Sequence, residues 1–274
     1  MSPIISFTCR AITAVAILTV TASGEVLYDN GGPNHNPSPN GFEMTQWIEA
    51  DDFSLATEAR VDAIIFWDVE LLANFQGTVL WQIYANNPDN TPGTLLYSGS
   101  ANSSHVQTPY AAPPFAEYLN SFSIPPVVLG PGTYWLALHN GPLSNYFNQR
   151  VYWESTGASG ARPSQSDMGP LFPRDWGSNS VPPGAPSELA FQITGAPAPR
   201  VTSIVRTSTH PQISFTTASG YTYRVEYKNS LSDLTWTAVS GAEQVSGSGA
   251  IMAVADPNAN TATLSRRFYR VVLL

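Results

Sequence analysis

Cysteine is nearly absent from this sequence: Cys9 is the only one in 274 residues. It precedes a ten-residue apolar run, AITAVAILTV (11–20), and Arg10 is the only charged residue ahead of that run. The run has the length of a signal-peptide core, is too short to cross a bilayer as a helix, and is followed by small residues. We therefore predict a signal peptide over residues 1–24, whose removal leaves a chain without disulfide or thiol chemistry.

Charge and long hydrophobic runs are also scarce. Charged residues make up 12% of the chain, and no second apolar run approaches the length of a membrane span. The sequence therefore predicts no membrane span in the exported chain and a secreted or cell-surface location. Glycine, proline, asparagine, serine and threonine are abundant instead, which is typical of short strands joined by many turns.

The charge balance changes across a proline-rich stretch, GAPAPRVTS (195–203). Residues 25–197 hold four arginines against sixteen acidic residues, a net charge of −12. Residues 198–274 hold seven basic against four acidic residues, a net charge of +3. Proline removes backbone donors and favours an extended chain, so we predict a boundary between two domains here. The acidic half would repel phosphates, which argues against a nucleic-acid partner.

Residues 25–197 have the pattern of strands rather than helices. Short stretches rich in β-branched and aromatic residues alternate with Asn, Gly and Pro turns. These stretches are VDAIIFWDV (61–69), GTVLWQIYA (77–85), TYWLALH (133–139), RVYWES (150–155) and ELAFQIT (188–194). Several are apolar on both alternations, as expected for strands covered on both faces. Many antiparallel strands in this length predict a jelly-roll-like β-sandwich.

Residues 198–274 show a cleaner alternation. In YTYRVEYK (221–228), three tyrosines and a valine share one face, and the polar and charged residues share the other. Further strands are expected in QISFTT, TWTAV, GAIMAVAD and RFYRVVLL. About six strands in this stretch predict a small β-sandwich of the fibronectin or immunoglobulin type. The whole exported chain is therefore expected to be all-β.

A series of strand and turn motifs carries a resemblance to a known family. In the first half these are LYDNGGPN, ADDFSL, IIFWDV, VLWQIYANN, PGTLLYSG, GTYWLALHNG, VYWEST and LAFQITG, in that order. This half resembles an exported bacterial β-sandwich domain of envelope proteins that often carry a PEP-type C-terminal sorting tag. The second half, with YRVEYKNSLSDLTWTAV and RFYRV, is similar to a short C-terminal domain of exported bacterial proteins. The resemblance implies an extracellular or surface location and carries no activity, and the tag itself is absent here.

Motifs for common catalytic chemistries are absent. The sequence holds no HExxH, GxSxG, P-loop or Rossmann glycine pattern, and four scattered histidines disfavour a zinc site. A glycoside hydrolase or lyase would need two carboxylates facing one cleft. Glu49 and Asp51 share a strand face, but Ser54 stands where a further acid is needed. Asp68 and Glu70 also share a face, near a strand end where solvated acids are common, so we expect structural roles and no enzymatic activity.

The other acidic and amide side chains of the first half could bind calcium. Hard cations take several oxygen ligands, and β-sandwiches often hold one where loops meet the first and last strands. If those two strands pair, the converging residues would be Asp29, Asn30, Asp51, Asp52 and Glu188. The alternative is that Asp29 and Asn30 cap a turn, while Asp51 and Asp52 make hydrogen bonds within loops.

The stretch around Trp135 and the loops after it supply the candidates for ligand binding. We expect Trp135 to be buried, because a tryptophan in a central strand usually packs in a core. We expect His139 to hydrogen-bond within the turn that follows. Loops more often carry binding function, and there the candidate ligand-binding residues are Asn145, Tyr146, Phe147, Arg150 and Trp176. Ordinary loop packing is the alternative for all of them.

These observations predict an exported, non-catalytic β-sandwich protein with a cell-surface, adhesive or matrix role. A carbohydrate-binding module, stabilised by calcium, is the first alternative. A glycoside hydrolase or lyase is the second. The expected partners are extracellular polysaccharides or surface proteins.

Overall fold

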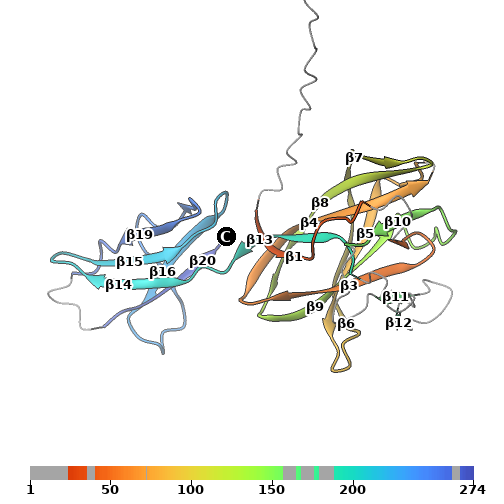
Figure 1. The fold of residues 1–274 in the computed structure, drawn as a ribbon. Helices are drawn as coiled ribbons and strands as arrows, with labels where there is room; N and C mark the ends of the chain where they lie inside the picture. The colour runs from red at the N-terminus through yellow and green to blue at the C-terminus, as the bar shows by residue number, and fades with distance from the viewer. Residues whose placement is uncertain are drawn as a thin grey trace, which may run out of the picture.

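The computed structural model describes residues 24–35, 41–71, 73–156, 165–167, 176–178, 188–260 and 266–274. The predicted signal peptide lies outside these ranges except for Gly24. Every regular element in them is a β-strand, so the all-β prediction is confirmed. No helix in these ranges is long and apolar enough to span a membrane. The strands form two β-sandwiches that lie end to end (Figure 1).

The first sandwich is built from strands β1 to β13, in two sheets. The seven-stranded sheet contains β1 (Glu25–Asp29), β2 (Gly41–Glu43), β4 (Ala59–Leu71), β7 (Ser104–Ala112), β8 (Phe115–Leu129), β10 (Val151–Glu154) and β13 (Phe191–Pro197). The six-stranded sheet contains β3 (Ile48–Leu55), β5 (Thr78–Asn86), β6 (Pro92–Asn102), β9 (Gly132–Asn140), β11 (Gln165–Asp167) and β12 (Gly177–Ser178). The first and last strands, β1 and β13, pair antiparallel.

The inner faces of these sheets enclose an aromatic core. Strand alternation turns Phe66 of β4, Trp153 of β10 and Phe191 of β13 into this core, where all three are fully buried. The Trp153 ring centroid lies 6.1 Å from that of Phe66 and 5.7 Å from that of Phe191, both in edge-on contact. Burial of each such side chain contributes about 1.5–3 kcal/mol, so these contacts hold β4, β10 and β13 in register.

The six-stranded sheet is also covered on its outer face. Trp135 of β9 and Tyr84 of β5 are 0% and 1% exposed there, so the expected burial of Trp135 is confirmed. The Trp135 indole Nε1 donates a hydrogen bond of 2.8 Å to Asn86 Oδ1. His139 is buried, and its Nδ1 lies 2.9 Å from the Gly141 carbonyl oxygen, so its expected turn contact is also present.

The second sandwich is built from strands β14 to β20. Its sheets contain β14 (Val201–Arg206), β15 (Pro211–Thr216) and β19 (Ile251–Ala255), and β16 (Thr222–Lys228), β17 (Thr237–Ala238), β18 (Val245–Ser246) and β20 (Phe268–Leu273). Tyr223 and Val225 of β16 are fully buried, which confirms the alternation predicted for this strand. The structure therefore shows two sheets in each half. The jelly-roll and immunoglobulin-type assignments remain predictions.

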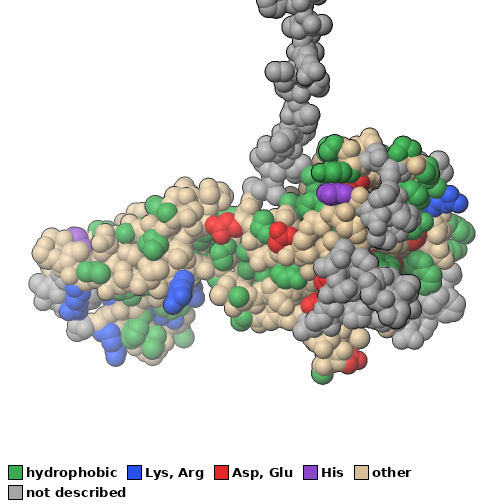
Figure 2. All heavy atoms as spheres, viewed as in Figure 1, with side chains coloured by type: hydrophobic (Ala, Val, Ile, Leu, Met, Phe, Trp, Pro, Cys, Tyr) green, Lys and Arg blue, Asp and Glu red, His purple; other side chains and the backbone are tan. Residues whose placement is uncertain are grey.

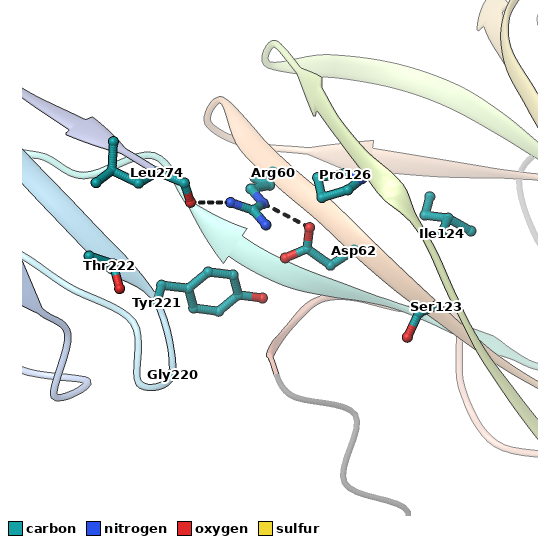
Figure 3. Close-up of a pocket in the computed structure, with 9 residues that line it drawn as sticks. All are labelled: Arg60, Asp62, Ser123, Ile124, Pro126, Gly220, Tyr221, Thr222 and Leu274. Atoms are coloured by element: carbon teal, nitrogen blue, oxygen red, sulfur yellow. Dashed lines mark hydrogen bonds and ion pairs between the residues drawn. The ribbon is translucent and has the colours of Figure 1, made fainter. Parts of the chain in front are cut away.

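Side chains from both sandwiches meet where the two halves join. Figure 3 shows Arg60 of β4 between Asp62 and the C-terminal Leu274, whose carbonyl oxygen accepts a hydrogen bond from the guanidinium group. Arg60 Nε also lies 2.8 Å from Asp62 Oδ1, and the guanidinium carbon is 5.7 Å from the Tyr221 ring centroid. These residues line a hollow of about 300 Å³ at the junction.

Candidate functional site

Two acidic side chains of β4 point into the first sandwich. Asp68 and Glu70 follow Phe66 at intervals of two residues, and alternate side chains of a strand share a face. Their exposed fractions are 0% and 1%. The expectation that they are solvated is therefore wrong. Strand β8 pairs with β4 through to Leu71, and the Phe75 backbone N–H donates to Glu70 Oε2 at 3.0 Å, so this end of β4 is enclosed.

The two neighbouring strands bring an amide and an imidazole to the same face. In the register of the sheet, Asn120 of β8 lies opposite Phe66 of β4, and His105 of β7 lies opposite Asn120. His105 Nδ1 lies 2.9 Å from Asn120 Oδ1, and His105 Nε2 lies 2.7 Å from Glu70 Oε1. His105 Nδ1 is also 3.9 Å from Asp68 Oδ2. We call Asp68, Glu70, His105 and Asn120 the inner polar cluster.

Two aromatic rings fix the plane of the His105 imidazole. The Phe75 ring stacks on it with centroids 4.4 Å apart and planes 9° apart. The Tyr118 ring stacks with centroids 4.0 Å apart and planes 13° apart. Because rings cover both of its faces, the imidazole presents its nitrogen atoms edgewise to the acids and the amide.

Burial and neighbouring charges set the protonation of the inner polar cluster. Burial raises the pKa of Asp68 well above its ordinary value, and Glu70 raises it further, while His105 lowers it. Burial alone would lower the pKa of His105, but Glu70, Asp68 and Asn120 outweigh burial and raise this pKa. Burial therefore favours the protonated form of Asp68, while the neighbouring acids favour the charged form of His105.

Some polar atoms of the cluster have no hydrogen-bond partner among the described residues. By hydrogen-bond geometry they are both carboxylate oxygens of Asp68, the Oε1 of Glu70, which has His105 as its ion-pair partner, and the Nδ2 of Asn120. A buried polar group without a partner costs about 1–3 kcal/mol, so such groups call for a specific explanation. Within the described ranges, Asp68, Glu70 and His105 form the one group of three metal-ligating side chains whose ligand atoms all lie within 4.8 Å of one another.

A second acidic pair lies on the opposite face of the same sheet. Glu117 of β8 and Glu154 of β10 are 4% and 1% exposed and share a hydrogen bond. Burial, followed by the charge of Glu117, raises the pKa of Glu154 to about 8. Glu117 Oε2 lies 2.7 Å from His35 Nδ1, and its Oε1 accepts a 2.7 Å hydrogen bond from the Thr108 hydroxyl. The loop after β1 therefore packs over this pair.

The residues of the predicted calcium site are partly gathered beside the β1–β13 pair. Asp51 is fully buried, and its Oδ2 accepts hydrogen bonds from Asn30 Nδ2 at 3.0 Å and Leu189 N at 2.6 Å. Its Oδ1 accepts from the Asp52 backbone N–H at 2.9 Å. Burial, then the charge of Glu188, raises the pKa of Asp51. Of the five residues, Asn30 and Asp51 thus meet through their side chains, while Asp52 contributes its backbone N–H and Glu188 acts on Asp51 through its charge.

Asp29, the fifth residue, makes separate contacts. Its Oδ1 accepts a 2.9 Å hydrogen bond from the Gly31 backbone N–H, and its Oδ2 accepts one of 3.0 Å from Gln192 Nε2. The first of these bonds is the turn cap that the alternative interpretation describes. Glu49, the partner of Asp51 in the proposed catalytic pair, is 2% exposed.

The candidate ligand-binding loop exposes one pair of rings. Tyr146 and Phe147 stack with centroids 4.9 Å apart, and Phe147 is 64% exposed. The Asn145 backbone N–H donates to the Pro142 carbonyl oxygen at 2.9 Å and closes the turn before them. Arg150 follows with a φ of 62°, in the left-handed region. Four of the five candidates therefore lie on one loop.

Trp176 lies elsewhere, on the outer face of the six-stranded sheet. Its ring meets that of Tyr84 edge-on, with centroids 5.4 Å apart, and it packs with the layer that contains Trp135. It is half-buried. Trp176 thus belongs to a covering layer, as the loop-packing alternative describes.

Sequence reasoning missed His105 and Asn120, because it assigned no strand to β7 or β8. Both strands contain prolines, which usually argue against a central strand. One signal was present: in FAEYLNSFSI, every second residue from Ala116 to Ile124 is apolar or aromatic except Asn120, and the residues between them are polar except Leu119. That period of two predicts a strand with Asn120 on its apolar face.

Comparisons with family models, with curated proteins and with solved structures give no match to this chain.

Proposed function

We propose that the protein is an exported, non-catalytic β-sandwich protein with a cell-surface, adhesive or matrix role. The observation that carries the proposal is the burial of its grouped carboxylates. Asp68, Glu70, Glu117 and Glu154 are each 4% exposed or less. Glycoside cleavage needs two carboxylates that face a substrate in an open cleft, one as acid and the other as base or nucleophile. Enclosed acids of this kind contribute to architecture instead.

The arrangement of the two sandwiches supports the same role. They lie end to end (Figure 1) and are joined through Arg60, Tyr221 and Leu274. A scaffold that fixes loops at its ends suits contact with a surface or a second molecule. The predicted signal peptide supplies the route out of the cell.

Localisation and turnover together test the proposal. We expect an epitope-tagged full-length chain, expressed in a bacterial host, to be degraded by protease added to intact cells or to be recovered from the medium. A control that lacks residues 11–20 should stay inside the cell. Retention of the full-length chain in the cytoplasm would contradict export. Release of reducing sugar from a polysaccharide, lost in Glu70→Gln, would contradict the non-catalytic assignment.

A carbohydrate-binding role is a second candidate, favoured by the exposed Tyr146–Phe147 stack. The flat face of an aromatic ring can pack against the C–H face of a sugar ring, and 64% of Phe147 is free to do so. Hydrogen-bonding groups of Asn145 and Arg150 lie on the same loop. This pairing of a ring with polar groups is the composition that sugar recognition requires.

Pull-down on insoluble polysaccharides separates this candidate from adhesion to proteins. If the loop binds glycans, Phe147→Ala should lower the bound fraction at least tenfold, while Tyr97→Ala, which removes an exposed ring from β6, should leave it unchanged. Equal binding by both variants and the parent chain would exclude the loop as the glycan site. Absence of binding by the parent chain would favour protein partners.

A further inference from the structure

We propose that Asp68, Glu70 and His105 bind one divalent transition-metal ion, with Zn²⁺ as the best fit, inside the first sandwich. The three side chains come from two strands of one sheet, β4 and β7, which β8 joins. Their ligand atoms lie within 4.8 Å of one another. The site would be architectural, because Asp68 and Glu70 are 0% and 1% exposed.

The donor set determines the kind of ion. Two carboxylate oxygens and one imidazole nitrogen match the ligands that Zn²⁺ takes, at about 2.0–2.2 Å. Calcium prefers six to eight oxygen ligands, and an imidazole is a poor substitute for them. Imidazole and carboxylate together suit first-row transition metals such as Zn²⁺, with Mn²⁺ a weaker competitor.

Asn120 and the two stacked rings already orient the imidazole for this role. His105 Nδ1 lies 2.9 Å from Asn120 Oδ1, a contact in which Nδ1–H donates to the amide oxygen. That bond leaves Nε2, which faces Glu70, as the ligand nitrogen. Metal-bound histidines usually have such a partner on the other ring nitrogen, where it fixes the tautomer. Phe75 and Tyr118 prevent the ring from rotating away.

The fully buried carboxylate of Asp68 is an independent observation that points to a ligand. The side chain has no exposed surface, and neither oxygen has a partner in good hydrogen-bond geometry among the described residues. The polar groups beside it are the Asn120 amide, which lowers its pKa, and His105 Nδ1 at 3.9 Å. Ordinary buried acids are paired or hydrogen-bonded. A cation between Asp68, Glu70 and His105 would use these lone pairs directly.

The charge balance of the site is defined by the same three groups. A neutral imidazole and two carboxylates would together compensate the charge of a bound dication. The site would then be neutral overall, which is the arrangement that a low-dielectric interior favours.

Direct binding measurements test this proposal without any activity assay. Protein expressed from the full-length sequence is treated with EDTA, exchanged into buffer, titrated with ZnCl₂ in a calorimeter and analysed for bound metal after gel filtration. We expect one zinc per chain, a higher melting temperature with zinc, and weaker binding of MnCl₂ and CaCl₂. Less than about a tenth of an equivalent of zinc on the folded parent chain would overturn the proposal.

Matched variants locate the ion. We expect Asp68→Asn and His105→Gln to weaken zinc binding more than about 100-fold, and Asn120→Ala, which removes only the orienting partner, by about 10- to 100-fold. His210→Gln, in the second sandwich, should leave it unchanged. Unchanged stoichiometry and affinity in folded Asp68→Asn and His105→Gln would place the zinc elsewhere and overturn the assignment.

X-ray absorption of the zinc-loaded parent chain keeps the proposal testable if those variants fail to fold. The expected spectrum has one imidazole among oxygen ligands. Two or more imidazoles, or oxygen ligands alone, would contradict the site. The proposal does not depend on the surface role, because a metal-free cluster would leave the localisation and turnover results unaffected.

Discussion

The two sandwiches bury acidic side chains in opposite ways. In the second, Glu226 is 5% exposed and lies between two arginines, with Arg224 Nε 2.8 Å from its Oε1 and Arg270 Nε 2.7 Å from its Oε2. Asp256 is fully buried and accepts hydrogen bonds from Arg267 at 2.6 Å and the Tyr269 hydroxyl at 2.9 Å. Each buried acid of the second sandwich therefore has its own cation.

The first sandwich groups its buried acids and gives them few cations. Its half of the sequence has four arginines for sixteen acids, and none of the described arginines contacts Asp68, Glu70, Glu117 or Glu154. The difference is visible in Figure 2, where Lys and Arg side chains are prominent on the second sandwich. Burial of an acidic side chain alone therefore does not indicate a functional site. A buried acid whose neighbours supply too little positive charge is the more informative feature.

The largest expected effect lies in the fully paired half. Asp256→Ala leaves Arg267 buried without its carboxylate, and breaking a buried pair in this way costs about 3–5 kcal/mol. We expect the unfolding free energy of the second sandwich, measured by urea denaturation, to fall by that amount. Glu243→Ala, which removes an exposed acid of the same sandwich, should change the unfolding free energy by less than about 0.5 kcal/mol. Equal effects would show that the pairing of Asp256 is unimportant.

The next effect is a pH dependence in the poorly paired half. Glu154 ionises at about 8 in the folded chain, mainly because it is buried beside Glu117, and near 4.5 when unfolded. The folded state holds this proton more tightly, so stability should fall as pH rises from about 4.5 to about 8, by up to about 1.4 kcal/mol per pH unit, and then level off.

Urea unfolding at intervals of half a pH unit measures this dependence. Glu154→Gln should flatten it, while Asp89→Asn, a substitution in an exposed turn of the same sandwich, should not. A parent chain whose stability rises over this window would contradict the raised pKa of Glu154.

A smaller effect is expected at the junction between the two halves. Arg60→Ala removes the bond to the Leu274 carbonyl and the contact with the Tyr221 ring, both partly exposed, so we expect a loss of about 0.5–1 kcal/mol. The maximum dimension of the protein, measured by small-angle X-ray scattering, should increase because the two halves move more freely. Arg206→Ala, on β14, serves as the control. An unchanged scattering curve would show that Arg60 does not hold the junction.

The smallest effect should come from Asp68→Asn in metal-free protein. Asparagine keeps the shape of the side chain and carries no charge, and burial already favours the uncharged form of Asp68 by raising its pKa. We therefore expect the unfolding free energy in EDTA to change by less than about 1 kcal/mol, in contrast to Asp256→Ala. Chemical denaturation in EDTA measures it. A loss of 3 kcal/mol or more, as for a paired acid, would mean that Asp68 has a partner in the protein.

Much of the fold could be predicted from the sequence, since strand alternation is local information. The stretches 61–69 and 133–139 lie within β4 and β9, and 77–85 lies in β5 except for Gly77. In the stretch 221–228, Tyr223 and Val225 are buried as predicted, whereas Glu226 on the opposite face is buried against its arginines. Strand β8 was missed because Pro125 and Pro126 interrupt its pattern. These prolines are accommodated where β8 has passed the end of β7 and the β4–β8 register shifts, so fewer backbone donors are needed there.

The inner polar cluster could be predicted only in part. The two-residue spacing of Asp68 and Glu70 placed them on one face, but which face depends on the pairing of distant strands. In the sequence His105 is one of four scattered histidines, and only the pairing of β8 with both β7 and β4 brings it near Asp68 and Glu70. The sequence argument against zinc rested on that scatter. The register of three strands brings the metal-ligating side chains together, and no local sequence pattern encodes that register.

Anomalous diffraction at the zinc edge, from crystals of the zinc-treated protein, tests the central claim most directly. The claim is that the first sandwich makes up for its missing cations with a metal ion. It predicts one peak within about 2.3 Å of atoms from Asp68, Glu70 and His105. No peak at this position, with the His105 imidazole still 2.7 Å from Glu70, would contradict it and identify the cluster as a proton-sharing structural group.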